Sequence, residues 1–409
     1  MRASDPQIEP SLAEILREWT RIGCVGFGGP PAHVALFREL CVGRRAWLTD
    51  EQFERALAAT NLLPGPASTQ LAIYCAWRLR GTRGALLGGP CFVLPGLVLI
   101  LVLSALFLSK SPPPWLRGGG MGAGAAVAAV AVRAGLDLAA PIWTRTSQGG
   151  RAPVLAYALA GAVAAALAGP WLVLVLLACG AVELARRRLA GGAPGPRAWT
   201  LPALWALARG SGAALRPSLH TGPLLAATAD PGGTGALVWT ALKVGALAFG
   251  GGFVIVPLMQ SDAVGTYHWM SHGQFLNAVA LGQVTPGPVT HTVAAVGYSA
   301  AGLPGALLAA LVAFAPSFSF ILLGAARFER LLANRQALAF LAGAAPAAAG
   351  AIVGAAVPLT TALAEGWQYA VLAAASVALL LLRRAIVPTL LLAGIAGVAA
   401  ALLGAQIPH

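Results

Sequence analysis

The feature that most restricts the fold of this chain is a series of apolar runs long enough to cross a lipid bilayer. A transmembrane helix needs about 20 apolar residues to span the ~30 Å hydrocarbon core. Runs of at least that length cover 86–108, 154–182 and 371–403. Hydrophobic residues make up 58% of the 409 residues and charged residues only 10%, against roughly 25% charged residues in soluble domains. The sequence therefore predicts an all-α polytopic membrane protein.

Several other classes of protein do not fit this composition. The net charge of +13 does not indicate nucleic-acid binding, because the arginines sit in short loops between apolar runs. The five cysteines form no Cys-x-x-Cys pair, so neither a disulfide framework nor a metal site is expected. We see no P-loop and no nucleophile–base pair, and therefore expect no ATP-driven pump in this chain alone, no enzyme and no cofactor. The charged N-terminal segment is typical of an amphipathic helix at the membrane interface.

The second half of the sequence repeats the first. At an offset of 222 residues, 27–70 aligns without a gap with 249–292, and 15 of the 44 positions are identical. These identities include Trp47, Phe53 and the Pro-Gly-Pro at 64–66, so a shared bias towards Ala and Leu does not explain them. We therefore divide the chain into an N-terminal repeat (1–190), a Gly/Pro/Arg-rich cytoplasmic linker (191–234) and a C-terminal repeat (235–409).

Loop charges predict that the two repeats have opposite orientations in the membrane. The loop after the first apolar segment carries Arg38, Arg44 and Arg45 in the first repeat, and no Lys or Arg in the second. Because basic loops favour the cytoplasm, the topology is predicted to be inverted. Both loops that flank the first Pro-Gly-Pro are basic and both loops that flank the second are not, which indicates segments that enter and leave on one face. We expect about five transmembrane helices plus one re-entrant Pro-Gly-Pro hairpin in each repeat.

Each repeat carries two breaks in its apolar segments, one rich in glycine and one at Pro-Gly-Pro. Backbone groups freed at such breaks must be buried in protein or line a wet cavity. The first N–H groups of a helix carry partial positive charge and bind anions, and Pro is favoured where a helix begins. We predict that the four breaks meet near the midplane and bind an anionic substrate; the alternative is that they only bend the helices. The candidate residues are Phe27, Gly28, Gly29, Pro30, His33, Asn61, Pro64, Gly65, Pro66, Ser68, Thr69 and Gln70 in the first repeat, and Phe249, Gly250, Gly251, Gly252, Gln283, Thr285, Pro286, Gly287, Pro288, Thr290, His291 and Thr292 in the second.

Four ionisable residues are further candidates. Arg21 and Lys243 occupy equivalent positions, and an ionisable residue inside a membrane span marks a functional site by default; snorkelling to the interface is the alternative. His33 and His291 lie beside the breaks and could carry coupling protons, unless they are only hydrogen-bonded in the core. Acidic residues such as Asp262 are assigned to loops. No carboxylate pair marks a cation path, which favours an anion as substrate.

The stretches "FGGPPAHVALF" and "NLLPGPASTQLAIY", repeated as "FGGGFVIVPLM" and "GQVTPGPVTHTVAAVGY", resemble the paired motifs of the chromate transporter (CHR) family. The similarity covers most of 20–110 and 240–325. It implies a two-domain protein of the bacterial inner membrane that exports chromate, driven by the membrane potential or a proton gradient. Ile255 stands where the first repeat has His33, so a role for His33 would belong to one repeat only.

The resemblance leaves three questions open. Sulfate is similar to chromate in charge and shape, so a transporter for another oxyanion such as sulfate is the main alternative. A channel would use the same repeat equally well. Whether the chain forms a homodimer does not follow from the sequence.

Overall fold

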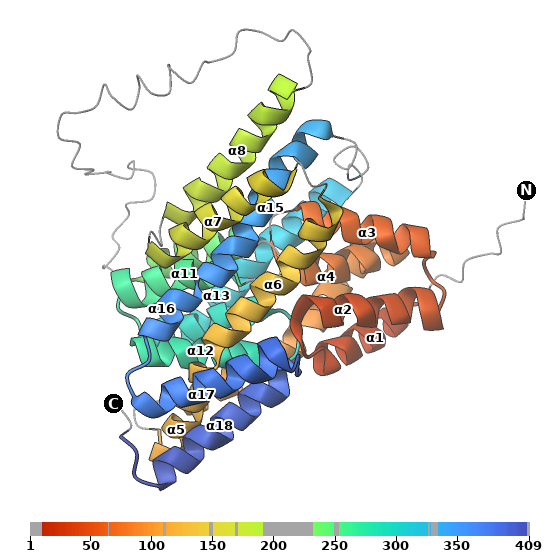
Figure 1. Ribbon diagram of the computed structural model, residues 1–409. Helices are drawn as coiled ribbons and strands as arrows, with labels where there is room; N and C mark the ends of the chain where they lie inside the picture. Colours follow the sequence, from red (N-terminus) through yellow and green to blue (C-terminus); the bar gives the residue numbers. More distant parts are fainter. Residues whose placement is uncertain are drawn as a thin grey trace, which may run out of the picture.

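A computed structural model describes residues 10–63, 65–108, 112–146, 150–167, 171–190, 232–248, 253–325, 328 and 334–406. Four candidate site residues at 249–252, the candidate Pro64 and most of the predicted linker (191–231) lie outside the described residues. Within these ranges every regular element is helical (Figure 1). Four of the helices are long and apolar enough to cross a membrane, namely Ala67–Phe107, Pro114–Arg145, Val289–Gly324 and Arg335–Thr361.

The helices of the two repeats follow one another along the chain. The first repeat contains α1 (Leu12–Val25), α2 (Gly29–Arg38), the π-helical turn η1 (Glu39–Arg44), α3 (Asp50–Leu62), α4 (Ala67–Phe107), α5 (Pro114–Ala125), α6 (Val127–Arg145), α7 (Arg151–Leu167) and α8 (Leu172–Ala190). The second contains α10 (Thr234–Leu247), α11 (Ile255–Gln260), the π-helical turn η5 (Ser261–Thr266), α12 (His272–Val284), η6 (Val289–His291), α13 (Thr292–Gly324), α15 (Arg335–Gly354), α16 (Ala356–Thr361), α17 (Gly366–Ser376), η8 (Val377–Leu381) and α18 (Ile386–Leu402).

In the first repeat, Leu63, Gly65 and Pro66 lie at the tip of a helical hairpin. The chain reverses again inside α4, where Arg80 and Gly81 have non-helical backbone angles and Gly84 packs on the carbonyl of Ala76. The first arm of α4 (67–80) therefore runs back alongside α3, and Ala59 of α3 shares an apolar cluster with Ile73. With 13 residues, α3 is roughly 20 Å long at ~1.5 Å per residue, which is enough to reach the middle of the bilayer.

The second repeat folds in the same way. Its chain reverses inside α13 at Ala301 and Gly302, whose backbone angles match those of Arg80 and Gly81. The first arm of α13 returns along α12, since Gly282 packs against Thr292 near the tip and the Ser299 hydroxyl donates to the carbonyl of Trp269 (2.8 Å) at the open end. We call residues 63–66 the first tip and residues 285–288 the second tip.

The glycine-rich break that precedes each tip also reverses the chain. Trp19 of α1 packs against Phe37 of α2, with ring centroids 5.3 Å apart. Farther along, Arg45 forms ion pairs with Glu14 and Glu18 of α1. Helix α2 and η1 therefore fold back along α1, a second hairpin that the sequence analysis did not predict. In the second repeat α11 and η5 fold back along α10 in the same way, because the Trp269 indole reaches the Gly232 carbonyl (2.9 Å).

Backbone details recur at equivalent positions of the two repeats, as a duplication requires. Both Pro-Gly-Pro helices enter through a capping box, formed by Thr49 with Gln52 and by Ser271 with Gln274. The remaining equivalent pairs are the π-helical turns η1 and η5, the left-handed residues Ala46 and His268, and Gly65 and Gly287 with φ of 121° and 91°.

The orientation of the repeats relative to each other follows from the second arms of α4 and α13. Gly89 lies directly against the ring of Phe318, and Phe92 belongs to the same apolar cluster as Phe314. Residue numbers thus rise along α4 while they fall along α13, so these equivalent helices are antiparallel. The polytopic all-α class with two inverted repeats is confirmed.

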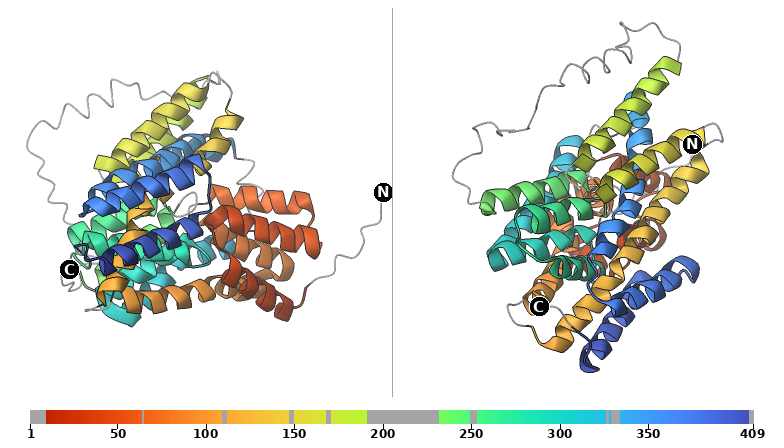
Figure 2. Two further views of the ribbon diagram at one scale, coloured as in Figure 1. Left: turned by 60° about the horizontal axis from the view of Figure 1, so that its bottom comes forward. Right: turned by 60° about the vertical axis from the view of Figure 1, so that its left-hand side comes forward.

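Small residues bring the remaining helices together. Gly161 of α7 packs on the backbone of Ala347 in α15, and Gly350 of α15 packs on Ala158. On the other side Gly118 of α5 packs on the backbone of Gly397 in α18. Glycine and alanine contacts of this kind allow the close backbone approach that drives helix association in lipid. As a result, α7, α8 and α15 lie side by side, while α5, α17 and α18 form a second group (Figures 1 and 2).

Candidate functional site

The second tip meets the glycine-rich break of the first repeat. The backbone N–H of Gly287 donates to the carbonyl of Gly26 (2.9 Å), and Nε2 of His33 lies 2.8 Å from the same oxygen. Gly96, in the second arm of α4, supports this contact, since a Cβ there would lie 2.0 Å from the carbonyl of Pro286. The second tip is thus held by elements of the first repeat.

The first tip makes the reciprocal contact with the second repeat. A Cβ on Gly65 would lie 3.2 Å from the hydroxyl of Ser317 and 3.3 Å from the carbonyl of Gly245, which is near the end of α10. It would also lie 2.5 Å from Nε2 of Gln70. Each tip therefore packs against the other repeat.

Three helices begin at the described breaks without a side-chain cap. Pro66 precedes α4, Pro288 precedes η6 and α13, and Gly28 precedes α2, which has Pro30 in its first turn. None of these residues caps its helix with a side-chain hydrogen bond. The first N–H groups of α4 and η6 can therefore interact with an anion, whereas Pro30 and Pro31 have no N–H and leave Gly29 as the one donor among the first three residues of α2.

Buried hydroxyl groups without a partner surround the tips. The hydroxyls of Thr69, Thr290 and Ser317 are buried and have no hydrogen-bond partner in the described part of the chain. A buried polar group that lacks a partner costs about 1–3 kcal/mol, so the arrangement is stabilised by any ligand that accepts from these hydroxyls. Ser317 was not among the predicted residues; its position as the equivalent of Gly96, at the end of "GALLAALVAFAPS", was the available signal.

Two other predicted hydroxyls already have hydrogen-bond partners. The hydroxyls of Thr285 and Thr292 donate to the backbone carbonyls of Gly282 (3.3 Å) and Val289 (2.8 Å), and so are already occupied. The remaining described candidates near the breaks divide by exposure: Ser68, Gln70, Gln283 and His291 are buried, whereas Phe27 and Asn61 are exposed.

The two basic candidates lie in ion pairs. Nζ of Lys243 is 2.5 Å from Oδ2 of Asp262, which also accepts from the hydroxyl of Thr240 (2.9 Å). Arg21 pairs with Glu18 at 3.5 Å. We find no contact between either basic residue and the tips among the described residues. The assignment of Asp262 to a loop was wrong, because it is buried within η5, where the return along α10 brings it to Lys243.

A cavity of about 820 Å³ leads to the first tip. Asn61, Leu63, Gly65 and Ala67 form one part of its wall. The rest comes from α6, α7, α8 and α15 and includes Tyr157, Glu183 and three arginines at the ends of α6 and α8, which are Arg145, Arg186 and Arg187. At the second tip, Gln283, which is the equivalent of the exposed and cavity-lining Asn61, is only 7% exposed, and Thr285 is 3% exposed.

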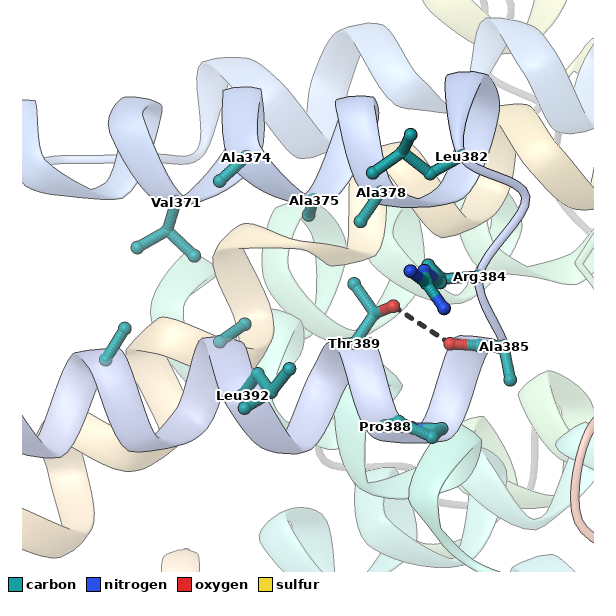
Figure 3. Close-up of a pocket in the computed structure, with 12 residues that line it drawn as sticks. Val371, Ala374, Ala375, Ala378, Leu382, Arg384, Ala385, Pro388, Thr389 and Leu392 are labelled. Atoms are coloured by element: carbon teal, nitrogen blue, oxygen red, sulfur yellow. Dashed lines mark hydrogen bonds between the residues drawn. The ribbon is translucent and has the colours of Figure 1, made fainter.

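A second cavity, of about 670 Å³, lies between α17 and α18 (Figure 3). Alanine, valine and leucine form most of its wall, with Arg384 and Thr389 as polar members. The hydroxyl of Thr389 donates to the carbonyl of Ala385 (2.9 Å). Because this cavity is apolar and includes no tip residue, it does not suit a doubly charged anion.

The fold and the convergent tips define a multi-pass membrane transporter. The sequence model of the family described as "Chromate transporter" matches residues 13–184 and 235–401, so both repeats are covered. The chain belongs to the chromate transporter family, in agreement with the resemblance of its motifs.

Named relatives support this assignment. The chain is 32% identical over 403 residues to the chromate transport protein of Cupriavidus metallidurans, covering 94% of this chain and 92% of the relative. It is 30% identical to the chromate transport protein of Pseudomonas aeruginosa over 368 residues (87% and 82%), and 30% identical to the probable chromate transport protein of Synechococcus elongatus over 349 residues (85% and 84%). No solved structure matches the chain.

Proposed function

We propose that this chain is a secondary transporter that exports chromate across the bacterial cytoplasmic membrane by alternating access. The observation that carries the proposal is the cavity that ends at the first tip, beside buried hydroxyls without partners, while Gln283 of the second repeat, the equivalent of the cavity-lining Asn61, is buried. Membership of the chromate transporter family supports chromate as the substrate.

The donors around the tips suit an oxyanion. Chromate has only acceptor oxygens, and its complement here is the first N–H groups of α4 and η6 together with the hydroxyls of Thr69, Thr290 and Ser317. Hydrogen bonds to a charged acceptor are about twice as strong as neutral ones. Gly65 and Gly287 allow the backbone of the tips to approach the anion closely, because a side chain at their positive φ would be strained.

Alternating access is supported by the inverted repeats. Two antiparallel copies of one fold can exchange conformations, so that the repeat now closed becomes the open one. An asymmetry of the described conformation supports this: a cavity reaches the first tip past Asn61, whereas the equivalent residue Gln283 is buried. Exchange of the two conformations would carry an anion bound between the tips from one side of the membrane to the other.

Loop charge and membrane potential support export as the direction of transport. The positive-inside rule favours the cytoplasmic side for the mouth of the cavity, which lies near Arg145 and Arg186. A potential that is negative inside favours exit of an anion by about 2.3 kcal/mol per charge per 100 mV, which doubles for a dianion. Coupling to protons is a further part of the proposal, with His33 and His291 as the candidate carriers.

The test is uptake of labelled chromate by everted membrane vesicles, whose outer surface is the former cytoplasmic face. We expect saturable uptake that increases with an imposed potential and that sulfate inhibits only weakly. Comparison with and without a proton gradient tests the coupling. Absence of uptake, or better transport of sulfate than of chromate, would contradict the proposed substrate.

A further inference from the structure

The mouth of the cavity holds a cluster of charged residues that the tips do not explain. Glu183 of α8 accepts from Nε of Arg186 (2.7 Å), from the second nitrogen of the same guanidinium (2.9 Å) and from Nε of Arg187 (2.6 Å). The phenol of Tyr157, from α7, donates to the same carboxylate at 3.1 Å. Arg145 lines the same cavity and forms no ion pair within the described ranges.

The carboxylate of Glu183 is held as a bound oxyanion would be. It is 2% exposed, and two guanidinium groups and a phenol surround its oxygens. Arginine is the usual partner of oxyanions, because its planar donors match two oxygens at once. By contrast, the side chains of Arg186 and Arg187 are themselves 49% and 52% exposed, so they retain donors that face the cavity mouth.

We propose that Arg145, Arg186 and Arg187 form a second anion-binding site, at the cavity mouth, in which Glu183 is an internal competitor. We call this set the vestibule. Three guanidinium groups and one carboxylate leave a net charge of +2, which complements a divalent tetrahedral oxyanion. The proposal rests on the proposed function, because it takes the cavity as the route of the substrate.

Competition by Glu183 limits how tightly the vestibule binds an anion and so allows its release. Three unopposed arginines would bind a dianion so tightly that it would leave slowly, whereas a transporter needs a site that captures and releases. When an anion arrives, Arg145 and the cavity-facing donors of Arg186 and Arg187 bind it, and Arg186 and Arg187 exchange their contacts with Glu183 for contacts with the anion. When the anion moves on to the first tip, Arg186 and Arg187 return to the carboxylate of Glu183, which favours release.

The alternative is that Glu183 only fastens α7 to α8. Replacement of Arg145 separates the two interpretations, because Arg145 takes no part in the Glu183 contacts. For Arg145→Gln we expect the KM for chromate at the outer face of everted vesicles to rise about tenfold, the loss expected for one charged hydrogen bond, with little change in maximal rate. Arg188→Gln is the matched control, since Arg188 is in the same turn of α8 as Arg187 but does not line the cavity.

Equilibrium dialysis of chromate against the purified chain in detergent provides a readout that does not depend on transport. Glu183→Gln should bind chromate several-fold more tightly than the wild type and release it more slowly, since the competitor has lost its charge. Weaker binding in Glu183→Gln would overturn the competitor role, and equal behaviour of Arg145→Gln and Arg188→Gln in both assays would overturn the vestibule. If Arg145→Gln weakens binding by dialysis while wild-type vesicles do not transport, the proposed function fails and the vestibule stands.

Discussion

The two Pro-Gly-Pro tips are equivalent in sequence and fold, yet they differ in access. Asn61, Leu63 and Gly65 line a cavity that opens near Arg145, whereas Gln283, the equivalent of the exposed Asn61, is buried and Gly287 is hydrogen-bonded to Gly26. The backbone at Gly65 and Gly287 is left-handed in both. Because equivalent parts have different surroundings, the difference reflects the conformation of the molecule and not the local structure of the tips.

The largest effect is expected from loss of glycine at the tips. Gly65→Leu and Gly287→Leu place a side chain at a positive φ, which costs about 1–3 kcal/mol of strain, and Leu at 65 also collides with Gln70. We expect chromate uptake in vesicles to fall to background in both variants. Immunoblotting of the membranes shows whether the protein is present in normal amount. Full activity in both variants would mean that the tips are only kinks.

The next effect concerns the supports of the two tips, which differ between the repeats. Gly96 and Ser317 are equivalent, but a Cβ on Gly96 would lie 2.0 Å from the carbonyl of Pro286, whereas Ser317 faces the more open first tip. Gly96→Ser should lower stability by about 1–3 kcal/mol, the usual cost of overpacking. The thermal midpoint of the detergent-solubilised protein measures this loss. Ser317→Gly is the control, with an expected change of much less than that, and equal changes would contradict the closed packing of the second tip.

A smaller effect is expected from the unpartnered hydroxyls. Thr69→Val and Thr290→Val keep the shape of the side chain and remove one donor, so each should raise the KM for chromate about five- to tenfold. Thr285→Val is the comparison, because the Thr285 hydroxyl already donates to Gly282. A KM for Thr69→Val or Thr290→Val no higher than that of Thr285→Val would exclude these hydroxyls from substrate binding.

The smallest effect is expected in a labelling experiment that tests access from solvent to the two tips. Asn61→Cys and Thr285→Cys can be compared in a background in which the exposed Cys24 is replaced by Ser. A membrane-impermeant maleimide applied to everted vesicles should label Cys at 61, which lines the cavity, and should leave Cys at 285 unmodified. Similar labelling at the two positions would remove the distinction between an open and a closed tip. Labelling at 285 from the opposite face during transport would demonstrate the exchange.

Much of the fold was predictable because it depends on local patterns that a duplication preserves. The repeat, the antiparallel orientation and the re-entrant tips follow from identities such as Pro66 and Pro288 and from the loop arginines. The return of α2 along α1 was not predictable, because glycine at 28 and 29 permits either a kink or a reversal. The choice depends on Trp19, Phe37 and Arg45, which meet only when the chain is folded.

The candidate site was likewise only partly predictable from the sequence. The glycines and prolines at the tips were recognisable, because the residue type alone determines which backbone conformations they allow. The ion pair between Lys243 and Asp262 could not be predicted, because Asp262 is 19 positions away in the sequence and its neighbours resemble a loop. Likewise, the sequence did not indicate a charged cluster at Glu183, Arg186 and Arg187, because Tyr157 meets Glu183 only when α7 packs against α8.

The sequence by itself determined that this is a duplicated membrane protein with four breaks in its helices, because lipid requires long apolar helices and Pro-Gly-Pro cannot continue one. Only the tertiary structure decided that each tip packs against the opposite repeat, that Ser317 lies beside the first tip, and that the arginines of α6 and α8 line a cavity reaching it while Gln283 of the second repeat is buried. These properties depend on contacts between residues far apart in the chain, and a duplicated sequence is compatible with either repeat being the one that the cavity reaches.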